Sequence, residues 1–172
     1  VEVSGKEGLD FAASVDALAP LGRTGTLLLD PRFLIVRTAG GAAYNEGVNN
    51  LFANNLGGTN VITPASINAL LANATLQANT DLTITDAIAM VNAGVTLTMQ
   101  AGRSVLINNN ISTNNGAISV TANDALATAA DRLGGAGNVT MAAGTTLNAG
   151  NQNITLSIGK IGNGCILTDL CA

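Results

Sequence analysis

The stretch VTLTMQAGRSVLINNNISTNNGAISVTAN, residues 95–123, decides the fold of this chain. Apolar residues alternate with Thr or Ser in Leu97-Thr98-Met99 and again in Ile118-Ser119-Val120, which is the pattern of a β-strand with one buried face. Asn and Gly gather between these runs, and both residue types adopt turn conformations at low cost. Short strands separated by such corners predict an all-β protein.

The same pattern recurs along the chain as an imperfect repeat. An apolar residue, a polar or small residue, Ala, and then Asn or Gly occur at residues 76–79, 99–102, 120–123 and 141–144, with spacings of 23, 21 and 21 residues. A short, nearly constant period of this kind is typical of a β-solenoid with one coil per repeat. Stacked coils bring equivalent residues into ladders. We expect an apolar interior ladder of Leu76, Met99, Val120 and Met141, and a small-residue ladder of Ala78, Ala101, Ala122 and Ala143.

Two other architectures would also contain short strands. A leucine-rich repeat has a similar period, but it needs a Leu-x-x-Leu-x-Leu frame with a fixed Asn, which we do not find in the chain. An antiparallel sandwich would not repeat its apolar residues at nearly constant spacing. The solenoid is therefore favoured, although the repeat places Ala149 where it expects a residue as large as Ile84 and Ile107.

The chain is expected to form a single domain over residues 1–172. Its four parts are N-terminal strands at 1–38, irregular loops with a short helix at 39–72, regular coils at 73–158, and a Cys-containing turn at 159–172. The coils are expected to be about 21–23 residues long, as the repeat spacing indicates.

Two features of the irregular part stand out. A helical turn is expected near residues 63–71, because Thr63 suits an N-cap and Pro64 suits the first helical position. Residues 39–58 have little strand signal, and they are expected to form an outward loop. Tyr44 and Phe52 make this loop the expected contact surface.

The composition excludes several classes of function. Only 10% of the 172 residues are charged, 47% are hydrophobic, 2% are aromatic, and there is no His or Trp. Disordered chains combine low hydrophobicity with high net charge, and this chain does the opposite. A net charge of −4 without clustered Lys or Arg argues against nucleic acid as a partner. No apolar run is long enough to predict a membrane-spanning helix.

The residue types also give little support to catalysis or metal binding. Without His, neither a Ser-His-Asp triad nor a Cys-His pair can form. The 11 Asp and Glu residues form no close pair in sequence, so a carbohydrate-active β-helix enzyme is the least favoured alternative. Calcium-binding solenoids place Asp where this chain has Asn, whose uncharged carbonyl binds calcium weakly. We therefore expect no catalytic residue, no metal and no cofactor.

Two cysteines, Cys165 and Cys171, lie close together near the end of the sequence. Two thiols without His cannot complete a tetrahedral zinc site, so a disulfide closing this short loop is favoured. Free thiols or a bond to another chain stay open as alternatives. The sequence begins without a charged segment followed by an apolar one, so it reads as a mature or internal fragment.

The first third of the chain resembles a family of large bacterial exoproteins. VEVSG at residues 1–5, GTLLLDP at residues 25–31 and the strand-like FLIV at residues 33–36 are similar to exoproteins of the filamentous haemagglutinin type. The runs at residues 67–84 and 97–105 are similar to that family too. The resemblance covers residues 1–158, whereas the Cys-containing end at residues 161–172 departs from it.

The resemblance implies a right-handed parallel β-helix that is exported across both membranes of a Gram-negative cell. It implies a secreted or surface location and a role in adhesion, aggregation or matrix. The expected function is therefore a non-enzymatic structural or adhesive module that assembles into filaments or matrix, or mediates adhesion.

The resemblance and the architecture also suggest partners. Copies stacked head to tail would make a contact that does not close, and such a contact yields a fibre. A cell-surface or matrix component is the other expected partner. The alternative function is a secretion-targeting domain recognised by an outer-membrane transporter.

Overall fold

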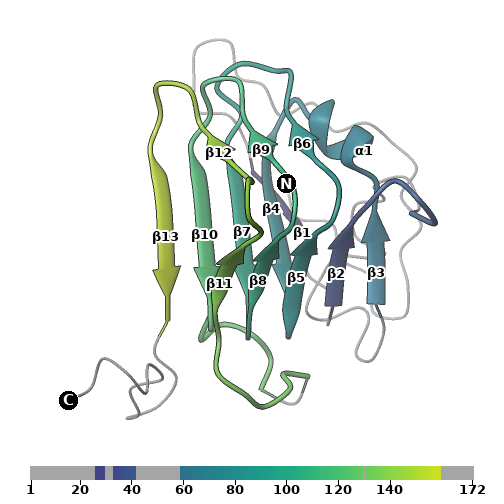
Figure 1. The fold of residues 1–172 in the computed structure, drawn as a ribbon, viewed down its shortest axis with the longest axis vertical. Helices are drawn as coiled ribbons and strands as arrows, with labels where there is room; N and C mark the ends of the chain where they lie inside the picture. The colour runs from purple at the N-terminus through teal and green to yellow at the C-terminus, as the bar shows by residue number, and fades with distance from the viewer. Residues whose placement is uncertain (1–25, 30–32, 42–58, 130, 160–172) are drawn as a thin grey trace.

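The computed structural model describes residues 26–29, 33–41, 59–129 and 131–159, and for residues 26–29 it describes the backbone alone. Within these ranges the chain forms three parallel β-sheets and one short helix (Figure 1). The prediction of an all-β chain is therefore confirmed for the part that the structure describes.

Each sheet is a row of parallel strands. Sheet A has the order β1 (Thr26–Leu29), β4 (Asn73–Ala78), β7 (Leu97–Ala101), β10 (Ile118–Ala122) and β13 (Ile154–Ile158). Sheet B has the order β3 (Thr59–Ile62), β2 (Phe33–Val36), β5 (Asp81–Ile84), β8 (Val105–Ile107) and β11 (Val139–Met141). Sheet C has the order β6 (Ile88–Ala89), β9 (Ile111–Ser112) and β12 (Leu147–Asn148). The helix α1 spans Pro64–Asn68.

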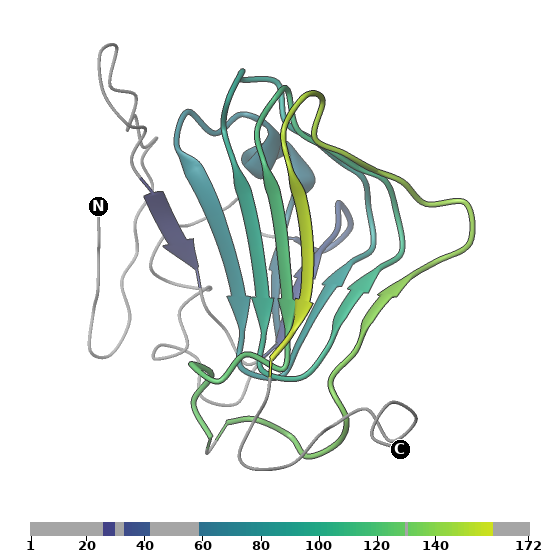
Figure 2. The ribbon, with the colours of Figure 1, turned by 90° about the vertical axis from the view of Figure 1, so that its left-hand side faces the viewer.

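Apart from β2 and β3, which both belong to sheet B, successive strands belong to different sheets, and the chain returns to sheet A one strand further along each time. We number the layers by these returns. Strands β1 and β2 form layer 1, β4 to β6 layer 2, β7 to β9 layer 3, and β10 to β12 layer 4. Strand β13 forms layer 5 and is the outermost strand of sheet A (Figure 2). Strand β3 lies beyond layer 1, on the outer side of β2.

The core of the stack is a ladder of apolar side chains from equivalent positions. Leu76 lies opposite Met99, and Met99 lies opposite Val120, and none of the three is exposed to solvent. Ala78 lies opposite Ala101, and both are fully buried, as is Ala122 on the next strand. Intervening residues of β7 and β10 are only half-buried, as expected for strands with one face inside.

The fourth member of each expected ladder is wrong. Val120 lies opposite Leu156, and Ala122 lies opposite Ile158. Met141 pairs with Ile107 in sheet B instead, and Ala143 lies in an exposed turn. The 21-residue repeat therefore does not continue past layer 4.

The physical reason is an insertion. Residues 124–138 leave the stack as a loop between β10 and β11, so the return to sheet A takes 36 residues, from Ile118 to Ile154. The two returns just before it take 23 residues, from Ala74 to Leu97, and 21 residues, from Leu97 to Ile118. The regular coils expected over residues 73–158 are thus interrupted by this loop.

Helix α1 takes the place of a strand at the start of sheet C. It begins at Pro64, inside the turn expected near residues 63–71, and Thr63 has the extended backbone of an N-cap without a capping side-chain bond. At its other end, the Asn68 side-chain oxygen accepts a hydrogen bond of 2.8 Å from the Ala89 amide, and the Asn68 carbonyl accepts one of 3.1 Å from Val91. These bonds satisfy backbone amides in β6 and just after it, on the side where the described chain offers no partner strand.

The irregular part of the chain also contains a strand that the pattern did not predict. Residues 39–72, expected to hold only loops and the helix, include β3, which pairs in parallel with β2. Its four residues, TNVI, are too few to show a clear alternation in the sequence. The strand is recognised in the structure because it pairs with the edge of β2 that β5 does not use.

Asn side chains join the layers at the corners. Asn73 accepts a hydrogen bond of 3.0 Å from the Thr96 amide in the following layer. Asn114 donates one of 2.9 Å to the Val91 carbonyl in the preceding layer. Neutral amides satisfy backbone groups without the desolvation cost of a charge, which accounts for corners rich in Asn in a chain so poor in charge.

Candidate functional site

The C-terminal end of the stack is an exposed apolar face. We call it the end face, and its members are Val139, Met141, Ile154, Leu156 and Ile158. Four of them are substantially exposed: Met141 by 41%, Ile154 by 42%, Leu156 by 52% and Ile158 by 39%. Val139, Met141, Leu156 and Ile158, with Ser157, line a hollow of about 400 Å³ in this face.

The end face continues the core. One layer inwards, the side chains at the equivalent positions are Ile118, Val120, Ala122, Val105 and Ile107, and each is at most 1% exposed. Register and chemistry are the same in the two layers, and only the covering layer differs. The end-face side chains therefore lie on the interior side of their strands, and covering them would contribute about 1 kcal/mol for each half-exposed residue.

The backbone of this end is open as well. Within the described part of the chain, β13, β11 and β12 each pair with a strand on one side only. Residues 138–159 contain no Lys, Arg, Asp or Glu and no Pro. Natural edge strands usually carry charges or Pro that prevent pairing with another chain, and this edge has neither.

At the opposite end of the stack, the described apolar side chains are covered. Ile62 on the outermost strand of sheet B is fully buried, and so are Ile67 on α1 and Ala72 after it. The two ends therefore differ in chemistry: apolar side chains are covered at the first and exposed at the last.

The loop at residues 124–138 lies beside the corners of layers 2 and 3. Thr80 donates a hydrogen bond of 2.9 Å from its hydroxyl to the Asp131 carbonyl, and Asn79 accepts one of 2.8 Å from the Thr128 amide. Arg103 binds the Asp81 carboxylate through two nitrogens, at 2.5 and 2.9 Å, and the Gly134 carbonyl at 3.1 Å. The bond to Asp81 raises the pKa of the Arg103 guanidinium. Side chains of two earlier layers thus anchor the loop.

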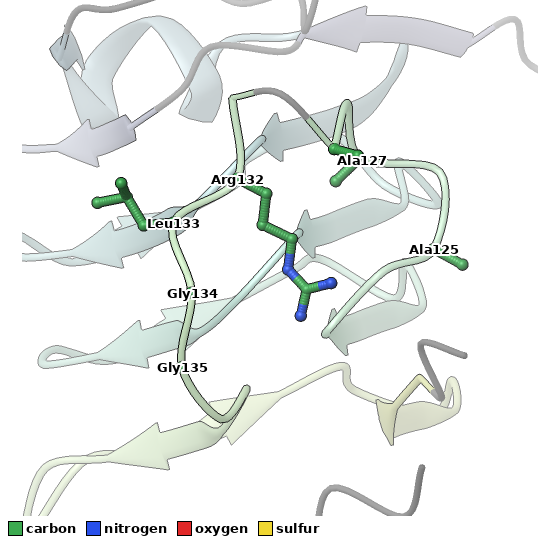
Figure 3. Close-up of a pocket in the computed structure, with 7 residues that line it drawn as sticks. Ala125, Ala127, Arg132, Leu133, Gly134 and Gly135 are labelled. Carbon is green, nitrogen blue, oxygen red and sulfur yellow. The ribbon is translucent and has the colours of Figure 1, made fainter. Parts of the chain in front are cut away.

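A shallow hollow of about 380 Å³ lies inside this loop (Figure 3). Small residues line most of it: Ala125, Ala127, Ala129, Gly134 and Gly135, with Leu133 beside them. The Arg132 guanidinium points into the loop and donates a hydrogen bond to the Asn123 side-chain oxygen. Burial lowers the pKa of Arg132, because desolvation disfavours its charged form. Among the described lining residues only Arg132 is ionisable, so the hollow offers hydrogen-bond donors rather than an acid–base pair.

The anchoring of the loop can be tested by proteolysis. Replacing Arg103 by Met is expected to raise the rate of tryptic cleavage after Arg132 about fivefold, because losing this partly buried ion pair costs about 1 kcal/mol. Arg103→Lys keeps the charge without the forked geometry, and an intermediate rate is expected. Cleavage would be followed by mass spectrometry. Equal rates for the wild-type chain and Arg103→Met would show that the loop is held by other contacts.

The expected site residues are only partly within the described chain. Tyr44 and Phe52, the expected contact surface, and Cys165 and Cys171, the expected disulfide, lie outside the described residues. The described ranges bring together no group of three acidic or thiol side chains that could hold a metal ion. They also contain no helix of the length and hydropathy needed to cross a bilayer.

The end face was missed in the sequence. The alternation of Ile154-Thr155-Leu156-Ser157-Ile158 identifies a strand with an interior side, but it does not show that the side chains on that side are exposed. The absence of charge over residues 138–159 was the available signal, because exposed edges are normally protected by charge.

Comparison with other proteins adds no assignment. No protein-family model, curated protein sequence or solved structure matches this chain.

Proposed function

We propose that this chain is a non-enzymatic, extracellular structural module that assembles through the end face. In this proposal the three sheets are the sides of a right-handed parallel β-helix of the filamentous haemagglutinin type. The module is secreted or held at the surface of a bacterial cell, where it contributes to filaments, matrix or adhesion.

The observation that carries the proposal is the end face. Five apolar side chains lie at one end of a parallel stack, together with three strands that pair on one side only within the described chain and a segment, residues 138–159, without charge. Unpaired strand edges recruit further strands, and exposed apolar side chains favour the same contact by leaving water. Strand pairing and the burial of apolar side chains both favour contact along the axis of the stack.

The residue chemistry favours assembly over catalysis. A general base and a nucleophile must lie within hydrogen-bond reach of each other, and the chain has no His to serve as that base. The hollow beside Arg132 combines a cation with Ala and Gly, which is suited to holding a ligand rather than transforming it.

Recognition by an outer-membrane transporter is the alternative function. It requires a surface that a second protein reads, and the loop at residues 124–138 is the described segment that departs most from the regular stack. This alternative would be favoured if the chain copurified with an outer-membrane barrel and still did so after its self-association had been abolished.

The experiment is a measurement of association in solution. Leu156→Lys places a charge in the end face, and sedimentation velocity is expected to show a shift from associated species to monomer, with at least a tenfold weaker self-association. Burying an unpaired ammonium costs more than the 1.4 kcal/mol that corresponds to a factor of ten.

The matched control lies one residue away. Thr155→Lys adds the same charge to the same strand, but residue 155 is on the outer side of β13, opposite Ser119. This variant is expected to associate nearly as the wild-type chain does. A wild-type chain that stays monomeric at high concentration would contradict the proposal.

A further inference from the structure

We infer that the hollow inside the loop at residues 124–138 binds a small monocarboxylate. In this site the Arg132 guanidinium holds the carboxylate, and the small apolar side chains around it contact the body of the ligand (Figure 3). The inference uses no residue of the end face, so its outcome is independent of the proposed assembly.

The Arg132 guanidinium is partly buried without an acidic partner. Within the described ranges its side chain bonds only to the uncharged Asn123 side-chain oxygen. The ion pair found in the same ranges joins Arg103 to Asp81, so Arg103 is already neutralised. Burial lowers the pKa of Arg132, and no neighbouring carboxylate of the described chain offsets this. A partly desolvated cation without a counter-ion is stabilised by an anion from solution.

The acidic side chains of the loop are engaged away from this cation. The Asp124 carboxylate accepts hydrogen bonds of 2.8 Å from the Gln100 side chain and 2.9 Å from the Leu126 amide. Asp131 is more than nine-tenths buried and forms no ion pair with Arg132 in the described chain. A ligand carboxylate would therefore supply the charge that the loop itself does not.

Both sides of the hollow are fixed to the stack. On one side the Thr80 hydroxyl accepts a hydrogen bond of 3.1 Å from the Leu133 amide. On the other side the Asn79 side chain accepts one of 2.8 Å from the Thr128 amide. These bonds hold the loop open around Arg132, so ligand binding does not have to pay the entropy of ordering it.

The lining favours a ligand with one carboxylate and a small apolar body. The guanidinium of Arg132 can donate two parallel hydrogen bonds to a carboxylate. The amides of Gly134 and Gly135 form no hydrogen bond within the described chain and are further donors in the lining. Ala127 and the 40% exposed Leu133 provide apolar contact. The volume of about 380 Å³ is near the lower end of the range of about 300–1,000 Å³ for ligand pockets.

The experiment is a titration of the wild-type chain with butyrate, followed by saturation-transfer NMR of the ligand. Butyrate combines one carboxylate with a short apolar chain, and butyramide has the same shape without the charge. A dissociation constant of about 1–10 mM is expected for butyrate, because a ligand with so few atoms binds weakly even in a well-formed site. Butyramide is expected to bind about tenfold more weakly.

Two variants of Arg132 and one control separate its role from that of overall charge. Arg132→Gln keeps a donor for Asn123 but removes the charge, and about tenfold weaker binding of butyrate is expected. Arg132→Lys keeps the charge without the fork, and about threefold weaker binding is expected. Arg37→Gln removes the same charge beyond β2, at the opposite end of the sheet B strands from the loop, and should bind as the wild-type chain does. Circular dichroism checks that each variant is folded.

A second measurement needs no variant. A carboxylate bound to Arg132 blocks its entry into the specificity pocket of trypsin. Butyrate at ten times its dissociation constant is therefore expected to slow tryptic cleavage after Arg132 about tenfold, whereas butyramide with matched salt is not.

Equal binding of butyrate and butyramide, or of butyrate by the wild-type chain and Arg132→Gln, would overturn the inference. Equal weakening by Arg37→Gln would overturn it too, since overall charge would then account for the binding. Inorganic sulfate that binds as tightly as butyrate would overturn the choice of a carboxylate in favour of an unselective anion site.

Discussion

Replacing Met99 by Ala is expected to lower the free energy of unfolding by about 2–5 kcal/mol, the usual cost of truncating a fully buried Met, Leu or Ile side chain. Met99 is completely buried and lies between Leu76 and Val120 in the centre of the apolar ladder. The strands above and below are held by backbone hydrogen bonds, so the cavity can collapse only in part. Urea denaturation followed by circular dichroism measures the loss.

Met141→Ala is the matched comparison. The repeat in the sequence makes residues 99 and 141 equivalent, whereas the structure buries the first and leaves the second 41% exposed. The truncation at Met141 is expected to cost less than about 1 kcal/mol in the monomer, because a half-exposed side chain loses little burial. Equal losses for the two variants would contradict the register of layers 4 and 5.

Gly116→Ala is expected to destabilise the chain by about 3 kcal/mol, at the upper end of what overpacking costs. A Cβ atom at residue 116 would lie 1.8 Å from the Val95 carbonyl oxygen of the preceding layer, and 2.5 Å from the Val95 carbonyl carbon. These are backbone atoms of a neighbouring layer, so they cannot move aside as the end of a side chain could. The Thr113 hydroxyl also donates a hydrogen bond to the Gly116 carbonyl and holds this turn in place.

Gly134→Ala provides the control for this substitution. A Cβ atom at residue 134 would meet no atom within 4 Å, so its thermal unfolding midpoint is expected to stay within a few degrees of that of the wild-type chain. If Gly116→Ala were as stable as Gly134→Ala, layers 3 and 4 would not approach each other as closely as described.

The strands of layers 2 to 4 could be predicted because their signal is local. Leu97-Thr98-Met99 and Ile118-Ser119-Val120 alternate with a period of two, and each run is bounded by Asn or Gly. Alternation depends only on which face of a strand is buried, so it is visible without knowing the partner strand. The spacing between these runs then gave the first ladder positions.

The pairing of the last strands could not be predicted from the same pattern. Residues 139–141 and residues 154–158 both alternate, and the sequence aligns the first with β10, whereas the second pairs with it. Loop-closure entropy grows slowly with length, so an insertion of some fifteen residues barely penalises the longer return. Packing decides instead, and the poor fit of Ala149 in the 21-residue alignment was the sign that the repeat had been interrupted.

The end face shows a further limit of pattern reading. A strand covered on both sides and a strand at the end of a stack have the same alternation, because the same interior positions are apolar in each. What differs is the neighbour, and only the structure shows that Leu156 lacks the cover that Val120 has. The assembly proposed above follows from that difference.

The most direct test of the layered stack, whose last described strand is β13, is a pair of disulfide variants within one chain, each made with Cys165→Ser and Cys171→Ser. Thr121 lies opposite Ser157, with their hydroxyl oxygens 2.9 Å apart, whereas the uninterrupted repeat would place Ala142 there. Thr121→Cys with Ser157→Cys is expected to oxidise to a monomeric disulfide, because neighbouring strands meet the required Cα separation. Thr121→Cys with Ala142→Cys is expected to stay reduced under the same conditions. A disulfide in the second variant and not in the first would contradict the stack, and with it the end face on which the proposed function rests.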